Sequence, residues 1–181
     1  MRITPTTVPD VLLVDLDVFK DPRGLFFEIH RESRYRENGI PQTFVQDNFS
    51  RSTKGVLRGL HYQVGHPQGK LVTVLAGRVF DVAVDIRKRS PTFGRWVGVE
   101  LSGETPQQLY IPPGFAHGFC VLSESADFLY KCTDVYAPAG ERGLIWNDPA
   151  LAITWPVTAP LLSPKDQSFR TLREMESELP D

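Results

Sequence analysis

Apolar and polar residues alternate in short runs along most of this chain of 181 residues, which is the pattern of β-strands with one buried face. Two such runs near the start, 11–19 and 25–29, flank the turn-forming sequence Asp-Pro-Arg-Gly at 21–24. Further strands are expected at 44–50, 56–63, 95–101, 107–111, 117–122 and 126–134. The clearest strand pair is expected within 70–86, where Ala76 and Gly77 would form its turn.

Helical signals are few. A short polar helix is expected at 32–38, because Gly39 and Pro41 follow it as stop signals in the right order. The acidic, weakly apolar segment after about residue 169 predicts a loosely packed helix or a frayed end. Short strands separated by Gly and Pro turns predict an all-β sandwich or barrel with a few short peripheral helices. Without a visible repeat or linker, 1–181 is expected to be a single domain.

The composition of the chain indicates which ligands it could attract and in which cellular compartment it is expected. The net charge of −2 gives no overall field that would attract nucleic acid or a membrane, so an anionic ligand would need a local group of cations. Cys120 and Cys132 lie in apolar, strand-like runs and are expected to be buried, reduced thiols. There is no charged-then-apolar leader and no apolar run approaching about 18 residues, so a cytoplasmic protein is expected.

Three short blocks carry the candidate chemistry. Arg-Gly-Leu-His-Tyr-Gln at 58–63 places His61 in an expected strand, three residues after Arg58. Gly-Lys-Leu-Val at 69–72 adds Lys70, and Pro-Pro-Gly-Phe-Ala-His-Gly-Phe at 112–119 adds His117. A candidate base and several cations on neighbouring strands suit proton abstraction next to a carbonyl group in an anionic substrate.

In their order and spacing, these blocks closely resemble the dTDP-4-dehydrorhamnose 3,5-epimerase family. The matching blocks continue through DPRGLFFE at 21–28, QDN at 46–48, Tyr130, YAP at 136–138 and SPKD at 163–166. The resemblance implies a cupin-type jelly roll, also called a double-stranded β-helix. It also implies a cofactor-independent epimerase that converts dTDP-4-dehydro-6-deoxy-D-glucose to dTDP-4-dehydro-L-rhamnose on the way to dTDP-L-rhamnose and cell-surface polysaccharide. No Gly-rich dinucleotide fingerprint is present, which agrees with the absence of a cofactor.

A metal site is not expected. Pro112, Gly114 and His117 resemble the second half of the cupin signature, whose first half normally supplies a His-x-His pair of metal ligands. Here the corresponding residues are His-Tyr-Gln at 61–63, and His66 lies too close to a Pro-containing turn to replace the missing histidine. Three or four converging ligands are needed to hold a metal ion.

The resemblance implies that His61 is the general base and that Asp166 orients it, as a carboxylate does in catalytic triads. A histidine titrates near pH ~6.5, which suits proton transfer at neutral pH. From residue type alone, His61 is better explained as a half-buried strand residue bonded to a carbonyl. Ser-Pro-Lys-Asp at 163–166 by itself favours a helix cap, with Ser163 at the N-cap and an acid at the third helical position.

Tyr130 is implied as the acid that returns a proton to the opposite face of the sugar ring, and Lys70 as the cation that stabilises the enolate oxygen at C4. Strand alternation places Phe128 and Tyr130 on one face and Leu129 on the other, which fits a site or a core equally. The alternative for Lys70 is a solvated lysine at a strand edge.

A larger set is implied in substrate binding. Its cations, expected to hold the pyrophosphate and the sugar, are Arg23, Arg58, Lys165 and His117. Its polar groups, expected to contact thymine, deoxyribose and sugar hydroxyls, are Glu28, Gln46, Asn48 and Glu141. Tyr136 is implied as the residue that stacks on the nucleotide base, and Phe26 and Asp47 belong to the set through their matching blocks. Taken singly, each charge could be a surface residue and Tyr136 a turn aromatic.

The resemblance also implies a homodimer in which Arg23 and Glu28 belong to an N-terminal segment that completes the partner's site. The sequence itself shows no interface, although an exposed apolar strand at 11–19 would need a cover. Three alternative functions remain: an epimerase acting only at C3 or C5 in a deoxysugar-antibiotic pathway, a non-catalytic sugar-nucleotide-binding cupin, and a metal-dependent cupin isomerase or dioxygenase. The second would not need both His61 and Tyr130, and the missing His-x-His pair disfavours the third.

Overall fold

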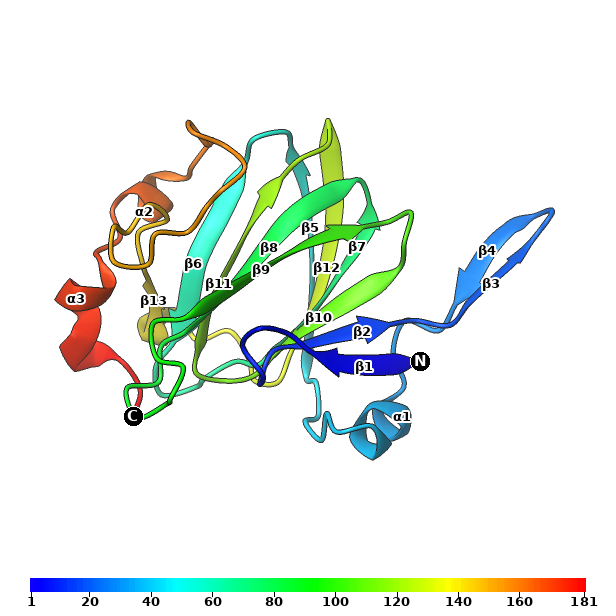
Figure 1. Ribbon diagram of the computed structural model, residues 1–181, viewed down its shortest axis with the longest axis horizontal. Coiled ribbons are helices and arrows are strands. Elements are labelled where there is room, and N and C mark those ends of the chain that lie inside the picture. The colour runs from blue at the N-terminus through cyan, green and yellow to red at the C-terminus, as the bar shows by residue number, and fades with distance from the viewer.

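The computed structural model describes residues 1–181, and its strands form two layered antiparallel sheets (Figure 1). The six-stranded sheet runs in the order β1 (Arg2–Pro5), β2 (Leu12–Asp15), β10 (Gln107–Ile111), β7 (Lys70–Ala76), β12 (Ser125–Cys132) and β5 (Gln46–Thr53). The five-stranded sheet runs in the order β13 (Glu141–Gly143), β6 (Leu57–Gln63), β11 (Phe115–Val121), β8 (Arg78–Asp85) and β9 (Trp96–Ser102). The expected all-β jelly roll is confirmed.

The remaining elements are short and lie around the two sheets. A separate hairpin consists of β3 (Val18–Asp21) and β4 (Gly24–Phe27), and it projects away from the body of the molecule (Figure 1). The helical segments are α1 (Glu32–Glu37), η1 (Pro138–Gly140), α2 (Pro164–Gln167), α3 (Leu172–Met175) and η2 (Glu176–Glu178). The expected helix at 32–38 corresponds to α1, whereas β1 and β13 were not predicted.

The principal core lies between the two sheets. Its 15 buried residues come from both layers, among them Val72 and Leu109 of the six-stranded sheet and Ala83 and Phe119 of the five-stranded sheet. Interdigitation of two inward faces is the normal way in which a β-sandwich buries apolar surface. Phe119 and Phe128 of this core also line a cavity that opens between the sheets.

The outer face of the five-stranded sheet is also covered. A second buried cluster joins Leu60 and Val82 of that sheet to Leu172, Met175 and Leu179 of the C-terminal segment. These three residues are 8%, 3% and 4% exposed, so the prediction of a loosely packed tail is wrong. The capping box of Thr171 and Glu174 fixes α3, and its apolar face then packs on the sheet.

The strand predicted over 11–19 is in fact two elements. β2 ends at Asp15 inside the six-stranded sheet, and β3 begins at Val18 in the projecting hairpin. Between them, the Asp17 carboxylate pairs with the side chain of Arg34 near the end of α1. This contact joins residues 17 positions apart, so it cannot be seen in the local pattern.

The segment 70–86 contains the two expected strands, but the prediction that they pair with each other is wrong. β7 and β8 are both strands, but β7 pairs with β10 and β12, while β8 pairs with β11 and β9. Gly77 therefore turns the chain from one sheet into the other, with φ of 78°. A Cβ at this position would lie 2.1 Å from the carbonyl oxygen of Ser125, so the crossing requires glycine.

Two further expectations concern the thiols and the membrane. Cys120 and Cys132 are both buried and unbridged, as expected. None of the helices is long or apolar enough to span a membrane.

Candidate active site

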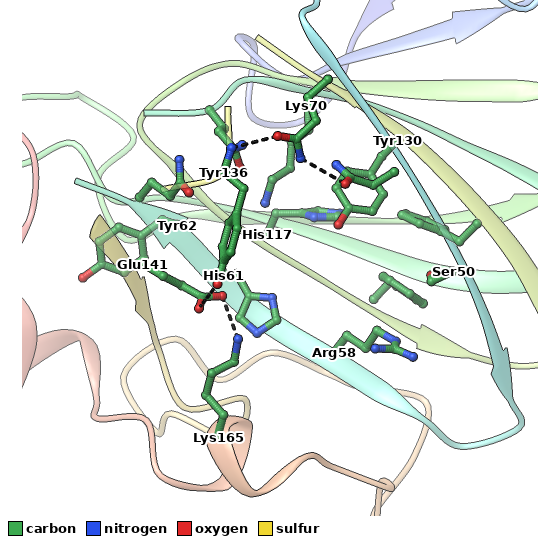
Figure 2. A pocket seen from close by; sticks show the side chains of 16 residues that line it. Ser50, Arg58, His61, Tyr62, Lys70, His117, Tyr130, Tyr136, Glu141 and Lys165 are labelled. Atoms are coloured by element: carbon green, nitrogen blue, oxygen red, sulfur yellow. Dashed lines mark hydrogen bonds and ion pairs between the residues drawn. The ribbon is translucent and has the colours of Figure 1, made fainter. Parts of the chain in front are cut away.

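A cavity of about 370 Å³ opens between the two sheets, and only five of its 16 lining residues are hydrophobic. The lining residues are Gln46, Asn48, Ser50, Arg58, His61, Tyr62, Gln63, Gln68, Lys70, His117, Phe119, Phe128, Tyr130, Tyr136, Glu141 and Lys165. Strands of both sheets contribute, with His61 on β6 and Tyr130 on β12. Figure 2 shows His61, Lys70, Tyr130 and Tyr136 directed into this cavity. Such a polar lining suits a polar or charged ligand.

The cavity brings together most of the residues singled out from the sequence. They are His61, Lys70, Tyr130, Gln46, Asn48, Arg58, His117, Tyr136, Glu141 and Lys165, with Asp166 directly behind His61. Six lining residues were not predicted, namely Ser50, Tyr62, Gln63, Gln68, Phe119 and Phe128. Gln63 ends the motif block around His61 and Gln68 directly precedes the block around Lys70, so their position beside the predicted residues was the available signal.

Asp166 orients the imidazole of His61. Its Oδ1 lies 2.7 Å from Nε2 of His61, and its side chain is only 3% exposed. Burial alone would raise the pKa of the Asp166 carboxyl, but the hydrogen bond and charge of His61 hold that pKa below its ordinary value. Ser163 caps α2 by accepting from the backbone N–H of Asp166. The capping interpretation therefore holds for Ser163, while the carboxylate of Asp166 bonds to His61.

A second neighbour, Phe169, packs against the ring of His61. The two rings meet edge to face with centroids 5.6 Å apart. Space for Phe169 exists because β13 has glycine at 143, where a Cβ would lie 2.3 Å from the phenyl ring. Phe169 was expected to begin a frayed tail, so its role beside the candidate base was not anticipated.

Lys70 is a buried cation without an ion-pair partner. It is 8% exposed, it lines the cavity, and no carboxylate lies within ion-pair distance of its ammonium group. Burial lowers the pKa of Lys70, because the charged form loses hydration. Negative charge that develops next to this group would restore the missing stabilisation.

Tyr130 reaches the cavity from the six-stranded sheet, which faces the five-stranded sheet that carries His61. Burial raises the pKa of its phenol, and the nearby thiol of Cys132 raises it further. The phenol therefore remains protonated at neutral pH and is able to donate a proton. Phe128, on the same face of β12, packs against it with ring centroids 5.9 Å apart. The expected alternation of this strand thus places both aromatic rings toward the cavity.

His117 is held from behind by Asp81, which was not anticipated. Nε2 of His117 lies 2.9 Å from Oδ2 of Asp81, and both side chains are almost fully buried. Burial lowers the pKa of His117, and the charge of Asp81 offsets part of this effect. His117 is also the cross-strand partner of His61 in the β11–β6 pairing, so the two imidazoles belong to neighbouring positions of one sheet.

The cavity mouth carries cations and polar groups. Nζ of Lys165 lies 2.7 Å from Oε1 of Glu141, and the hydroxyl of Tyr136 donates to Oε2 of the same residue at 2.9 Å (Figure 2). The Nε of Arg58 donates to Ser52 at 3.1 Å. Arg58 forms no ion pair within the chain, so its charge is available to an anion.

Four predicted binding residues lie outside this cavity. Arg23 and Phe26 belong to the projecting hairpin, where their surfaces are largely exposed and Arg23 pairs with Asp21. Glu28 pairs with Arg31 and Arg34, and Asp47 pairs with Lys131. Within one chain, none of these four residues lines the cavity.

A metal centre would need several His, Cys, Asp or Glu side chains that converge on one point. No group of three or more His, Cys, Asp and Glu side chains stands close enough together to hold a metal ion. Metal independence remains a prediction that requires a test on the protein.

Comparison with known proteins places these features in a family. The family model described as dTDP-4-dehydrorhamnose 3,5-epimerase matches residues 5–174. The dTDP-4-dehydrorhamnose 3,5-epimerase of Pseudomonas aeruginosa is 55% identical over 178 residues, which are 97% of this chain and 98% of that protein. The protein of the same name from Neisseria gonorrhoeae is 57% identical over 97% of this chain, but the chain spans only 54% of that longer relative.

Among solved structures, the crystal structure of dTDP-6-deoxy-D-glucose-3,5-epimerase from Legionella pneumophila in complex with dTDP-4-keto-L-rhamnose is similar to this chain with a TM-score of 0.96. The two sequences are 55% identical, and the match covers 99% of this chain and 97% of the other. The similarity therefore extends through both sheets and the segments around the cavity.

Proposed function

The chain belongs to the dTDP-4-dehydrorhamnose 3,5-epimerase family, and from this premise we propose that its cavity holds dTDP-4-dehydro-6-deoxy-D-glucose between His61 and Tyr130. The protein is an isomerase that inverts C3 and C5 of this 4-keto sugar and gives dTDP-4-dehydro-L-rhamnose. The product feeds dTDP-L-rhamnose biosynthesis for cell-surface polysaccharide, in the cytoplasm. The C4 ketone acidifies the protons on both neighbouring carbons, so a base, an enolate stabiliser and an acid suffice.

His61 removes the proton from the carbon next to the ketone. The pair of electrons from the broken C–H bond moves into the C3–C4 or C5–C4 bond, and the carbonyl electrons move onto the C4 oxygen. The imidazole becomes a cation, which Asp166 stabilises from 2.7 Å away. Phe169 keeps the ring from turning out of this orientation.

Lys70 stabilises the C4 oxygen while it carries negative charge. A preorganised cation at the position where charge develops is commonly the largest contribution to such a reaction. Lys70 meets this requirement because it is buried, lines the cavity and has no carboxylate partner of its own. The positive charge is therefore most useful after the enolate has formed.

Tyr130 gives its phenolic proton to the carbon from the face opposite His61. A proton taken from one face and returned to the other inverts the carbon, and the enolate collapses to the ketone. His61 and Tyr130 stand on different sheets, which is the arrangement that a two-faced reaction needs. His61 then loses its proton and Tyr130 regains one through solvent, so that the second carbon can react.

The cations and polar groups at the cavity mouth hold the nucleotide part. Arg58 and Lys165 bind the pyrophosphate, to which guanidinium and ammonium groups are suited. Gln46, Asn48 and Glu141 bond the deoxyribose and the base, and Tyr136 stacks on the thymine. This set would also favour a non-catalytic binding protein, but it would not explain His61, Asp166, Lys70 and Tyr130 in the same cavity.

The observation that carries the proposal is a base with its orienting carboxylate and a phenol from the opposite sheet in one cavity with an unpaired lysine. The test is incubation with the 4-keto sugar nucleotide in heavy water, followed by NMR of the product. Deuterium at both C3 and C5, with both centres inverted, is the expected result. Label and inversion at only one carbon would instead indicate a mono-epimerase.

The projecting β3–β4 hairpin favours a homodimer. Phe19, Leu25 and Phe26 on this hairpin are 64%, 49% and 68% exposed, which is unusual for large apolar residues unless a partner covers them. We infer that the hairpin packs on a second copy, where Arg23 and Glu28 complete the partner's site. Asp47, at the edge strand β5, would face the incoming segment.

Mixing two inactive variants tests this arrangement. Arg23→Ala impairs the hairpin, and His61→Ala removes the base. If the hairpin serves the partner's site, each mixed dimer has one intact site, so random mixing restores about a quarter of the wild-type sites. No restoration after subunit exchange, or a monomer in sedimentation, would show that the hairpin does not act across a dimer.

A further inference from the structure

The side chain of Gln63 holds the backbone on both sides of Tyr136. Its Oε1 accepts from the N–H of Ala137 at 2.8 Å, and its Nε2 donates to the carbonyl oxygen of Val135 at 3.2 Å. The second proton of the amide goes to the carbonyl oxygen of His66 at 2.8 Å. Gln63 is 8% exposed, and both of its donor hydrogens are used.

Two other glutamines hold the same segment. Gln46 accepts from the N–H of Tyr136 at 2.8 Å, and Gln68 donates to the carbonyl oxygen of Asp134 at 2.9 Å. Strand β12 has ended at Cys132, so residues 134–137 have no ladder of a sheet to position them. Side-chain amides supply the hydrogen bonds that a strand would otherwise supply.

Tyr136 is consequently fixed at both ends. Its backbone is bonded by glutamines, and its hydroxyl donates to Glu141 at 2.9 Å. The residue is nevertheless 50% exposed and lines the cavity, so its ring presents a free surface that is already in place. Preorganisation of such a surface lowers the entropic cost of binding a flat ligand.

We propose that Gln63 and Gln68 are positioning residues for nucleotide recognition, acting through Tyr136. They hold the tyrosine ring where the thymine base stacks, through their hydrogen bonds to the backbone at 134–137. This inference rests on the proposed function, in which Tyr136 stacks on the base. Gln63 stands two residues after His61 on β6, so one strand carries the base of the reaction and the support of the nucleotide platform.

The test is a double-mutant cycle read as dTDP affinity by isothermal titration calorimetry. Tyr136→Ala should weaken dTDP binding by about tenfold, which is typical for loss of a base–aromatic stack. Gln63→Met should weaken it by about three- to tenfold, up to the loss seen without the ring, because it removes the hydrogen bonds on both sides of the tyrosine. In the Tyr136→Ala background, Gln63→Met should cost less than about twofold more, since its effect passes through the missing ring.

The steady-state kinetics of Gln63→Met should agree with its dTDP affinity. Gln63→Met should raise KM for the sugar nucleotide by about the same factor as Kd for dTDP, while kcat changes by less than about threefold. The catalytic side chains His61, Lys70 and Tyr130 make no hydrogen bond to Gln63, so the chemical step is left intact. A general loosening of the fold would lower kcat as well.

Two variants control for folding. Gln68→Met loses a single hydrogen bond at a half-buried position, and it should weaken dTDP binding by about two- to tenfold with the same dependence on Tyr136. Gln68→Met replaces Gln63→Met in the double-mutant cycle if circular dichroism shows that Gln63→Met does not fold. Gln107→Met removes a glutamine whose amide bonds Asp15 outside the cavity, and it should bind dTDP as the wild type does.

The outcomes separate the inference from its premise. Equal losses from Gln63→Met with and without Tyr136, or full affinity in a folded Gln63→Met protein, would overturn the positioning role and leave stacking untouched. Normal dTDP affinity in Tyr136→Ala would overturn the stacking role itself and, with it, the inference.

Discussion

The carboxylate of Asp166 and the imidazole of His61 meet at 2.7 Å although 105 positions separate them in the chain. Helix α2, which carries Asp166, begins at Pro164 and is capped by Ser163. The cap fixes the first helical turn, and that turn aims the carboxylate at strand β6. One short sequence therefore serves both a helix terminus and the orientation of the candidate base.

Asp166→Asn should lower kcat by about a hundredfold or more, because an amide cannot stabilise the imidazolium that forms when His61 takes a proton. The fold should survive, since asparagine is nearly the same size. The matched control is Ser163→Ala, which should lower stability by about 1 kcal/mol through loss of the cap and leave kcat within about threefold. Near-normal turnover in Asp166→Asn would reduce Asp166 to a structural residue.

Arg58→Ala should weaken dTDP binding by about ten- to hundredfold, because a charge-assisted hydrogen bond to phosphate contributes about 1.5–3 kcal/mol. The effect should appear with dTDP alone, since the pyrophosphate is present without the sugar. Arg51→Ala is the matched control, because Arg51 pairs with Asp127 and does not line the cavity. Unchanged affinity in Arg58→Ala would place Arg58 outside the pyrophosphate site.

The alkaline limb of the pH–rate profile should report Lys70. Burial lowers the pKa of Lys70 from its ordinary value of 10.5, so this lysine loses its proton at a lower pH than a free lysine does, whereas burial raises the pKa of Tyr130. The rate of the wild type should therefore fall at a pH below 10.5. In Lys70→Arg, whose side chain stays charged, the residual rate should not fall in that range. A limb that is the same in both proteins would assign it to another group.

The free energy of unfolding should rise with pH over the same alkaline range in which the rate falls. Between the lowered pKa of Lys70 and 10.5, the unfolded chain binds more protons at this residue than the folded chain. The free energy of unfolding of the wild type, measured against that of Lys70→Met, should thus rise with pH in this window. A flat difference in urea titrations would mean that the lysine is as easily protonated in the fold as in water.

The purified enzyme should keep full activity after dialysis against a strong chelator. His61-Tyr62-Gln63 stands where a cupin metal site would have its ligand pair, and no cluster of three suitable ligands is present. Activity before and after chelation, with metal content checked by mass spectrometry, is the measurement. Loss of turnover that one divalent ion alone restores would overturn the metal-free mechanism.

Much of this site could be predicted because its residues lie in compact blocks. Arg58, His61 and Lys70 sit within 13 positions on two strands that are consecutive in the chain, so local spacing was informative. The supports behind them could not be predicted in this way. Asp81 and Phe169 contact His117 and His61 through the fold, and nothing in their own neighbourhoods marks them.

The fold shows the same division between local and long-range information. Strand positions followed from alternation and turn residues, whereas pairing did not. β7 is buried on both faces for most of its length, so its pattern could not show that it leaves β8 and pairs with β10 and β12. The C-terminal segment looked polar, yet Leu172, Met175 and Leu179 lie on the side that meets the sheet.

The roles of base and acid can be separated by isotope exchange. His61→Ala should abolish both epimerisation and incorporation of solvent deuterium, because no enolate forms without the base. His66→Ala is the control, since that histidine is exposed, pairs with Asp134 and does not line the cavity. Label exchange that persists in His61→Ala would place the base elsewhere.

Tyr130→Phe should give the complementary result. The base and the bulk of the ring remain, but the phenolic proton is gone, so the enolate forms and is reprotonated from the face of His61. Deuterium should then enter with retention of configuration, while inversion falls by about a hundredfold or more. We expect C5 to suffer more than C3, where water or another donor substitutes. The measurement is the stereochemistry and deuterium content at each carbon by NMR. Inversion of both centres at the normal rate would show that Tyr130 is not the acid, and the proton on the second face would then come from another group in the cavity.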